Sequence, residues 1–267
     1  MNIPESEYIE RCALEDLHAA ADEIDKASAG LESMVLDSSF VSIASNLPAS
    51  AIVINRTLGL GLGLETSEEE VEAIVSAYNA QNIERYFVQV SPHHQPETTE
   101  NWLAAHGLSQ GRGWQKFSRN RSVVEPRQSK LSVKEIHSDP DLAFGRIVCN
   151  AFDIGDEGVS WLSKLPARPD WHIFMSFHGD TPAGVGALYV KDGLGWTDFG
   201  ATAPEFRRMG SQSALMSARL ECALDLGCQQ IFTCTGVSVP GDPQHSYSNI
   251  LKAGFKESYV RENYVPG

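Results

Sequence analysis

The chain has 267 residues, with 35 acidic and 21 basic side chains and a formal net charge of −14. This length is at the upper limit for one hydrophobic core, so we expect two compact domains of about 130 residues each. An apolar fraction of 42% excludes an intrinsically disordered chain. The excess of negative charge excludes a general affinity for nucleic acid, because binding phosphates requires a basic surface.

No apolar run approaches the roughly 18 residues of a membrane-spanning helix, so we expect no integral membrane protein. The acidic N-terminal segment lacks the apolar stretch of a signal peptide. The five cysteines include no C-x-x-C pair, and three of them lie in apolar segments. We therefore predict a reduced, cytoplasmic protein with no metal site.

Apolar periodicity predicts two helices in the first half. The first covers residues 6–28 and ends at Gly30. The second begins at Ser67, where a Ser-x-x-Glu pattern indicates a capping box, and ends at Asn82. Shorter runs predict the remaining elements: strands at 41–43, 51–54, 85–90 and 113–117, and a short helix at 96–106.

The polar segment 124–130 contains a proline and lacks periodicity, so it is the best candidate for a linker. After it a second series of elements begins. These are strands at 131–136, 171–177, 183–190, 195–201, 229–235 and 255–265, and helices at 140–152, 159–165, 208–226 and 245–253.

The two halves look like copies of one plan. In each, a long helix ends at a residue that tolerates a left-handed conformation, and a strand, a short helix and a Gly-hydrophobe pair follow. Asn82 and Gly107 are 25 residues apart in the first half, and Gly227 and Gly254 are 27 residues apart in the second. We predict domains at 1–124 and 130–267; two unrelated α/β halves are the alternative.

The turn before the long helix of the second half has the composition of an anion site. Arg207 and Arg208 can pair with a diphosphate, and Gly210 lets a ligand oxygen approach the backbone. Ser211 and Ser213 add small hydroxyls at the start of the helix, where the first amides lack acceptors and the helix dipole is positive. The alternative is an arginine pair placed there by chance, on an acidic surface that binds other proteins.

This turn, PEFRRMGSQSAL (204–215), resembles the acyl-CoA diphosphate loop of GNAT superfamily N-acetyltransferases, whose pattern is Arg/Gln-x-x-Gly-x-Gly/Ala. The segment NILKAGFK (249–256) resembles the short helix and Gly-Phe strand start of that family. The resemblance covers residues 130–267, and the first half resembles a degenerate second copy. It implies an α/β (α+β) fold of two GNAT-like domains, each a mixed, largely antiparallel twisted sheet flanked by helices.

The resemblance also implies an acetyl-CoA-dependent N-acetyltransferase. Such an enzyme moves an acyl group directly to an amine acceptor, without a covalent enzyme intermediate. The residues expected to hold acetyl-CoA are Phe199, Gly200, Ala201, Thr202, Arg207, Arg208, Met209, Gly210, Ser211, Gln212, Ser213 and Asn249. Gln212 departs from the family pattern, which has a small residue at this position.

Two residues are candidates for proton transfer. Asp198 could take the proton of the amine directly or through water, or could be a solvated or salt-bridged carboxylate. Many family members carry a tyrosine where this chain has Ile250, so Tyr247 could be the substitute acid, or could serve packing alone. Ile250 and Gln212 motivate the alternative function, a non-catalytic CoA-binding sensor or scaffold module.

The first half is not expected to bind CoA. Its GLGLGL segment (59–64) lacks the G-x-G-x-x-G spacing, and the helix after it opens with carboxylates that would repel a diphosphate. These carboxylates are Glu65, Glu68, Glu69 and Glu70. The first half would instead cover the sheet, shape the acceptor pocket or mediate assembly, for example as a homodimer.

The acceptor is expected to be a small-molecule or peptide amine, and the net charge favours a cationic one by electrostatic steering. Trp171, His172 and His178 could line its pocket or face the core. Cys234 has only His245 as a conceivable base, so we interpret it as a core thiol rather than a nucleophile.

Overall fold

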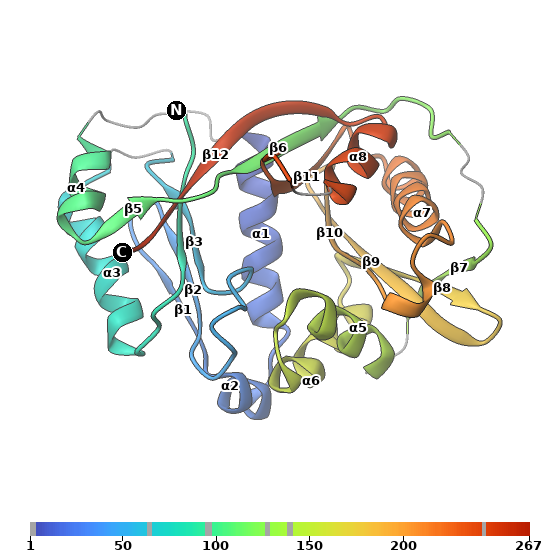
Figure 1. Ribbon diagram of the computed structural model, residues 1–267, viewed down its shortest axis with the longest axis horizontal. Coiled ribbons are helices and arrows are strands. Elements are labelled where there is room, and N and C mark those ends of the chain that lie inside the picture. The colour runs from blue at the N-terminus through green and yellow to red at the C-terminus, as the bar shows by residue number, and fades with distance from the viewer. Residues whose placement is uncertain (1–3, 63–65, 94–97, 126–128, 138–140, 242–243) are drawn as a thin grey trace.

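The computed structural model describes residues 4–62, 66–93, 98–125, 129–137, 141–241 and 244–267. Its strands form one sheet in the order β1-β2-β3-β4-β12-β6-β11-β10-β9-β8-β7, and β5 pairs with β12 (Figure 1). The strands are β1 Leu31–Val35, β2 Phe40–Ala44, β3 Arg56–Leu60, β4 Phe87–Val90, β5 Leu108–Gln110, β6 Trp114–Arg119, β7 Ser132–Ile136, β8 Trp171–His178, β9 Thr181–Lys191, β10 Leu194–Thr202, β11 Gln230–Gly236 and β12 Lys256–Pro266. The helices are α1 Glu5–Ala19, α2 Glu23–Ala29, α3 Glu68–Ala80, α4 Thr99–Ala105, α5 Leu142–Phe152, α6 Val159–Leu162, α7 Ser211–Asp225 and α8 His245–Lys252.

The two halves of the sheet repeat one pattern of strand directions. In the first, β1, β2 and β3 are antiparallel neighbours and β4 joins β3 in parallel. In the second, β7 to β10 are antiparallel neighbours and β11 joins β10 in parallel. Each half then receives an antiparallel strand from the other: β12 pairs with β4, and β6 pairs with β11. Since β6 and β12 also pair with each other, neither half of the chain completes its part of the sheet alone.

Helices cover both faces of the sheet, and strand side chains alternate between them. In β2, Phe40 and Ala44 belong to a core that α1, α5 and α6 share, whereas Val41 and Ile43 pack beneath α3. A third core lies under α7 and α8, next to the α3 core along the same face. Helix α1 contacts strands of both halves, β3 and β10 among them, and lies across the middle of the molecule (Figure 1).

The predicted elements of the second half are confirmed to within a few residues, and two predictions in the first half are wrong. The helix expected at 6–28 is two helices, because Asp22 leaves the helical conformation and its side chain accepts from the N–H groups of Ile24 and Asp25. Residues 51–54 form turns rather than a strand, and the strands β1 and β3 on either side of β2 were not predicted.

The capping box predicted at the start of α3 forms on one side only. The Ser67 hydroxyl accepts from the N–H of Glu70 at 3.2 Å, as expected. The Glu70 carboxylate, however, accepts from the backbone and hydroxyl groups of Ser38 and Ser39 instead of returning to Ser67. The first turn of α3 is acidic, and one of its carboxylates, that of Glu70, is occupied by hydrogen bonds within the protein. Glu65 lies outside the described residues.

A buried group of charged side chains joins α1 to the middle of the sheet. The Glu10 carboxylate lies 2.6 Å from Arg56 on β3, 2.5 Å from Lys116 on β6 and 2.6 Å from Arg261 on β12. Glu7 adds a second carboxylate, 2.9 Å from Arg261. Burial by itself raises the pKa of Glu10, but Arg261, Lys116 and Arg56 outweigh it and hold that pKa well below its ordinary value.

Among the described residues, no helix combines the length and apolar character needed to cross a lipid bilayer.

We expect Glu10→Gln to lower the free energy of unfolding by about 3–5 kcal/mol, because it leaves Lys116 and Arg56 buried without a directly bonded carboxylate. The measurement is urea unfolding. Because the pKa of Glu10 is depressed in the folded chain, its contribution is present above the ordinary value of 4.5 and is lost as the pH falls below it. The exposed Glu84→Gln is the control and should change stability by no more than about 0.5 kcal/mol. Equal, small effects of both substitutions would contradict the prediction.

Candidate functional site

The parallel strands β10 and β11 diverge toward their carboxyl ends. In the described chain their ladder joins Leu194–Trp196 to Gln230–Phe232 and goes no further, although both strands continue. The pairing of β10 with β9 also shifts register between Asp198 and Ala201, and Phe199 has a φ of +47°. The bulge therefore lies just past the point where the ladder with β11 ends.

The predicted anion turn lies where β10 leads into α7. Arg208 has a φ of +64° and Gly210 a φ of +88°, and α7 begins at Ser211 without a side-chain cap. Within the described residues, the N–H groups of Ser211, Gln212 and Ser213 donate to no acceptor. These free amides at the start of a 15-residue helix fit an anion.

Arg207 and Arg208 supply the positive charge at this turn. Both side chains are exposed, and no carboxylate of the described chain forms an ion pair with either of them. Two unpaired guanidinium groups beside free helix amides fit the charge and the several acceptor oxygens of a diphosphate.

Three contacts hold the turn in place, and one of them corrects the sequence analysis. The Ser211 hydroxyl is buried and lies 2.8 Å from the hydroxyl of Ser176, so only its main-chain N–H is available to a ligand. The prediction that this hydroxyl serves the ligand is therefore wrong. The Gln212 amide donates to the carbonyl of Ala201 at 2.7 Å and to the hydroxyl of Thr202 at 2.9 Å, which ties α7 to the bulged strand. The Met209 carbonyl accepts from the N–H of Lys130.

Arg219, two turns further along α7, contacts the bulged strand from the core. It is buried and donates to the carbonyls of Asp198 at 3.1 Å and Ala187 at 3.3 Å. A Cβ at Gly186 would lie only 2.8 Å from its Nε, so this glycine makes room for the guanidinium. Burial lowers the pKa of Arg219 to about 10. The sequence analysis missed Arg219, because a lone arginine on a helix gives no sign of being buried.

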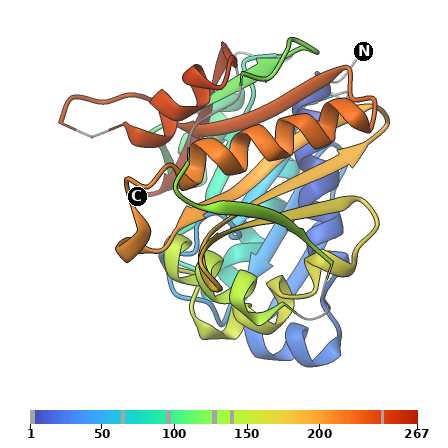
Figure 2. The same cartoon turned by 90° about the vertical axis from the view of Figure 1, so that its right-hand side faces the viewer.

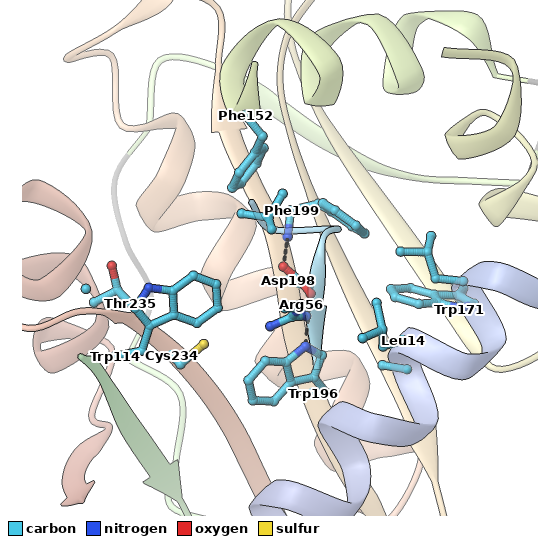
Figure 3. Close-up of a pocket in the computed structure, with 14 residues that line it drawn as sticks. Leu14, Arg56, Trp114, Phe152, Trp171, Trp196, Asp198, Phe199, Cys234 and Thr235 are labelled. Carbon is cyan, nitrogen blue, oxygen red and sulfur yellow. Dashed lines mark hydrogen bonds between the residues drawn. The ribbon is translucent and has the colours of Figure 1, made fainter. Parts of the chain in front are cut away.

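A pocket of about 230 Å³ opens at the bulge, on the face covered by α1 and α5 (Figure 3). Both halves of the chain line it. The lining residues are Ala13, Leu14, Leu17, Val53, Arg56, Trp114, Phe152, Trp171, Trp196, Asp198, Phe199, Cys234, Thr235 and Gly236. Five of them are aromatic, and Asp198 is the only carboxylate among them. Trp171, for which both a pocket and the core were open, lines the pocket and also belongs to the buried core. Arg56, Trp114 and Phe152 were missed, since they come from segments far apart in the sequence.

Asp198 lies at the centre of this pocket (Figure 3). Its carboxylate accepts from the indole Nε1 of Trp196 at 3.0 Å and from the N–H of Phe199 at 2.7 Å. Burial raises the pKa of Asp198 above its ordinary value, and Arg56 and the two hydrogen bonds lower it only in part. A carboxylate with a raised pKa, held in an apolar pocket, has the properties of a general base.

One of the buried charges described above, Arg56, lines the pocket, and a second, Lys116, contacts a tryptophan of its lining. The guanidinium of Arg56, bonded to Glu10, lies 5.4 Å from the ring centre of Trp114, and the ammonium of Lys116 lies 4.5 Å from that of Trp196. The two indoles are therefore held by cations beneath them, and their positions depend on the contact between α1 and the sheet.

Tyr247 and Asn249 lie on α8, and neither lines the pocket. The Tyr247 hydroxyl donates to Glu257 at 2.6 Å, and its ring packs edge-on against Phe117. Burial, followed by the bond to Glu257, raises the pKa of Tyr247 to about 12, so the phenol is protonated at neutral pH. Asn249 is half-buried, and the roles predicted for both residues stay predictions.

The remaining residues that the sequence analysis considered for the pocket or as a nucleophile are Cys234, His178 and His172. Cys234 lines the pocket, but burial raises its pKa to about 12 and His245 is exposed, which supports its interpretation as an unreactive thiol. His178 is exposed and its ring lies 5.7 Å from that of Phe206. His172 points to the opposite face of the sheet, where it meets Glu135.

No family model matches the chain, and no curated protein matches it in sequence. Solved structures do match it. A GCN5-related N-acetyltransferase from Kribbella flavida is 13% identical, with 100% of this chain and 97% of that chain covered and a TM-score of 0.67. One from Sphaerobacter thermophilus is 12% identical, with 98% and 93% covered and a TM-score of 0.56. A tandem GNAT protein from the clavulanic acid biosynthesis pathway is 12% identical, with 97% and 94% covered and a TM-score of 0.55.

The chain therefore has the fold of the GCN5-related N-acetyltransferases over its whole length, which confirms the predicted fold class. The boundaries predicted at 124 and 130 stay predictions.

We expect Trp196→Phe to raise the pKa of Asp198 further, because the substitution removes a hydrogen bond that favours the charged carboxylate. The measurement is a pH titration of the ¹³C-labelled aspartate carboxyl by NMR. Trp114→Phe is the matched control, since it also replaces an indole ring of the pocket with a phenyl ring but leaves both hydrogen bonds of Asp198 in place. An unchanged or lowered pKa in Trp196→Phe would contradict the role given to the indole.

Proposed function

We propose that this chain is an acetyl-CoA-dependent N-acyltransferase that moves the acyl group directly to an amine bound in the pocket between its two halves. One observation carries the proposal. The free amides and unpaired arginines at the start of α7 and the aromatic pocket around Asp198 lie at the two ends of the same bulged segment of β10.

In this proposal the cosubstrate is held by the second half of the chain. Its diphosphate binds Arg207 and Arg208 and the free N–H groups of the first turn of α7. The pantetheine arm then runs along β10, past the point where the ladder with β11 ends, and brings the thioester to the bulge at Phe199. The fit rests on the turn itself, where the backbone conformations of Arg208 and Gly210 keep the amides open.

The reaction requires a neutral amine. Asp198 accepts a proton from the bound ammonium group, directly or through one water, and its raised pKa makes it a stronger base than an exposed aspartate. The amine nitrogen attacks the thioester carbon, the C–S bond breaks, and the thiolate takes up a proton. Tyr247 on α8 is the candidate for that donor; its hydroxyl carries a proton and has to leave the carboxylate of Glu257 to give it up.

The lining of the pocket indicates the class of acceptor. The lining has one carboxylate, Asp198, and one cation, Arg56, which is paired with Glu10. Asp198 and the rings of Phe152, Trp171 and Phe199 therefore leave the pocket able to attract a cation. The net charge of −14 steers cations toward the protein. We therefore expect an amine that is cationic before transfer and whose carbon skeleton contacts the aromatic rings.

We expect the double substitution Arg207→Ala with Arg208→Ala to weaken acetyl-CoA binding by about tenfold or more, because it removes both charges from the diphosphate site. Isothermal titration calorimetry measures the affinity. Arg146→Ala is the control. It removes another exposed arginine, which lies on α5 outside the turn before α7, and should leave the affinity unchanged. A wild-type protein that does not bind acetyl-CoA at millimolar concentration would overturn the proposal.

We expect Asp198→Asn to lower kcat/KM by about 10²-fold to 10⁴-fold, the range for loss of a general base. For the wild-type protein, kcat/KM should fall as the pH falls through the raised pKa of Asp198, because the protonated carboxyl cannot accept a proton. The asparagine variant should lose this dependence. Release of free thiol with a panel of amines measures the rate, and the exposed Asp180→Asn is the control. If acetyl-CoA binds but no amine releases thiol, the chain is a CoA-binding module without catalysis.

A further inference from the structure

Three side chains with ligand chemistry meet on the face of the sheet opposite the pocket. They are Glu135 on β7, His172 on β8 and Cys222 on α7, and one ligand atom from each lies within 4.8 Å of the others. The Nδ1 of His172 is 2.9 Å from a carboxylate oxygen of Glu135. All three side chains are half-buried, so they are held by their surroundings yet open to a small ion.

The fold brings these residues together from distant parts of the sequence. Glu135 lies opposite Phe174 in the antiparallel pair β7–β8, so His172, two residues before Phe174, projects from the same face. Helix α7 contacts β7 and β8 on this face and lies across the strands at the side of the molecule turned toward the viewer in Figure 2. Cys222 is near the carboxyl end of α7, and the anion turn lies at its other end.

Two further observations point to a cation. A second imidazole, His137, has its Nε2 3.9 Å from the other carboxylate oxygen of Glu135, and its side chain is 75% exposed. In the part of the chain that the structure describes, Glu135 forms ion pairs with these two histidines and with no lysine or arginine. A carboxylate surrounded by imidazoles and a thiol, without a competing ammonium or guanidinium group, is a set of donors rather than an ordinary salt bridge.

We propose that Glu135, His172 and Cys222 form a binding site for a divalent transition-metal ion of the Zn²⁺ type, with His137 or water as the fourth ligand. Thiolate, imidazole and carboxylate together suit Zn²⁺ and its neighbours in the first transition row, whereas Mg²⁺ and Ca²⁺ prefer oxygen alone. Burial and then Glu135 raise the pKa of the Cys222 thiol to about 12, as at Cys234, so the thiol is protonated without metal, and binding of the ion releases this proton to solvent. The ion ties the carboxyl end of α7 to the edge strands, and it takes no part in acyl transfer. The sequence prediction of no metal site considered only closely spaced ligands.

Cobalt titration tests the site, because a thiolate bound to Co²⁺ gives an absorption band in the near ultraviolet and tetrahedral Co²⁺ absorbs strongly in the visible. The full-length protein is first dialysed against a chelator and then titrated with Co²⁺, and Zn²⁺ is added last. We expect both bands in the wild-type protein and their loss when Zn²⁺ displaces the cobalt. Cys222→Ser should lack the near-ultraviolet band, and His172→Gln, which keeps a donor for Glu135, should bind at least about tenfold more weakly.

Cys234→Ser is the matched control, since Cys234 is also half-buried but lies on the other face of the sheet; this variant should keep both bands. A second readout is thermal unfolding: Zn²⁺ should raise the Tm of the wild-type protein and of Cys234→Ser, but not of Cys222→Ser. If Cys222→Ser does not fold, Glu135→Gln on the edge strand replaces it and should weaken Zn²⁺ binding in competition with a chromophoric chelator. Absence of both bands in the wild-type protein at millimolar Co²⁺, or equal bands in Cys222→Ser, would overturn the site.

Discussion

The carboxylate of Glu10 is bonded to three cations that come from β3, β6 and β12, and this contact fixes how the two halves share one sheet. Removing these charges from water costs free energy, and only the attraction between closely paired, hydrogen-bonded charges offsets that cost. The pairing requires α1 to lie across the exchanged strands β6 and β12. With α1 there, Arg56 and Lys116 lie against the rings of Trp114 and Trp196, so two aromatic residues of the pocket depend on the same contact.

The halves contribute different chemistry to the site that we propose. The second half holds the positive turn before α7, the bulge of β10 and Asp198. The first half has an acidic helix start at the corresponding place, but it contributes α1, Arg56 and Trp114 to the wall of the pocket. The pocket is thus built by both halves: the second supplies its carboxylate, and the first supplies Arg56, Trp114 and the residues of α1.

Features that depend on adjacent residues were predicted well, and the hydrogen-bond partners of side chains were not. The turn at 207–210 was found because arginines, a glycine and a helix start are all adjacent in the sequence, and the structure keeps its amides free. The hydroxyl of Ser211 was assigned to a ligand, yet β8 supplies Ser176 as its partner. The prediction of one long helix at 6–28 was wrong for a local reason. Asp22 caps a new helix, although the apolar periodicity continues across the break between the two helices.

The sequence by itself determined the order of elements in the second half and the charge of the turn before α7, because periodicity, caps and helix ends depend on neighbours within a few residues. The fold class came from the resemblance of residues 204–215 and 249–256 to a known family. The tertiary structure alone decided the exchange of β6 and β12, the pocket, and the meeting of Glu135, His172 and Cys222. Each of these depends on which distant segments pack together, and that choice is made by burial of apolar area and pairing of buried charge over the whole chain, which leaves no pattern at short spacing.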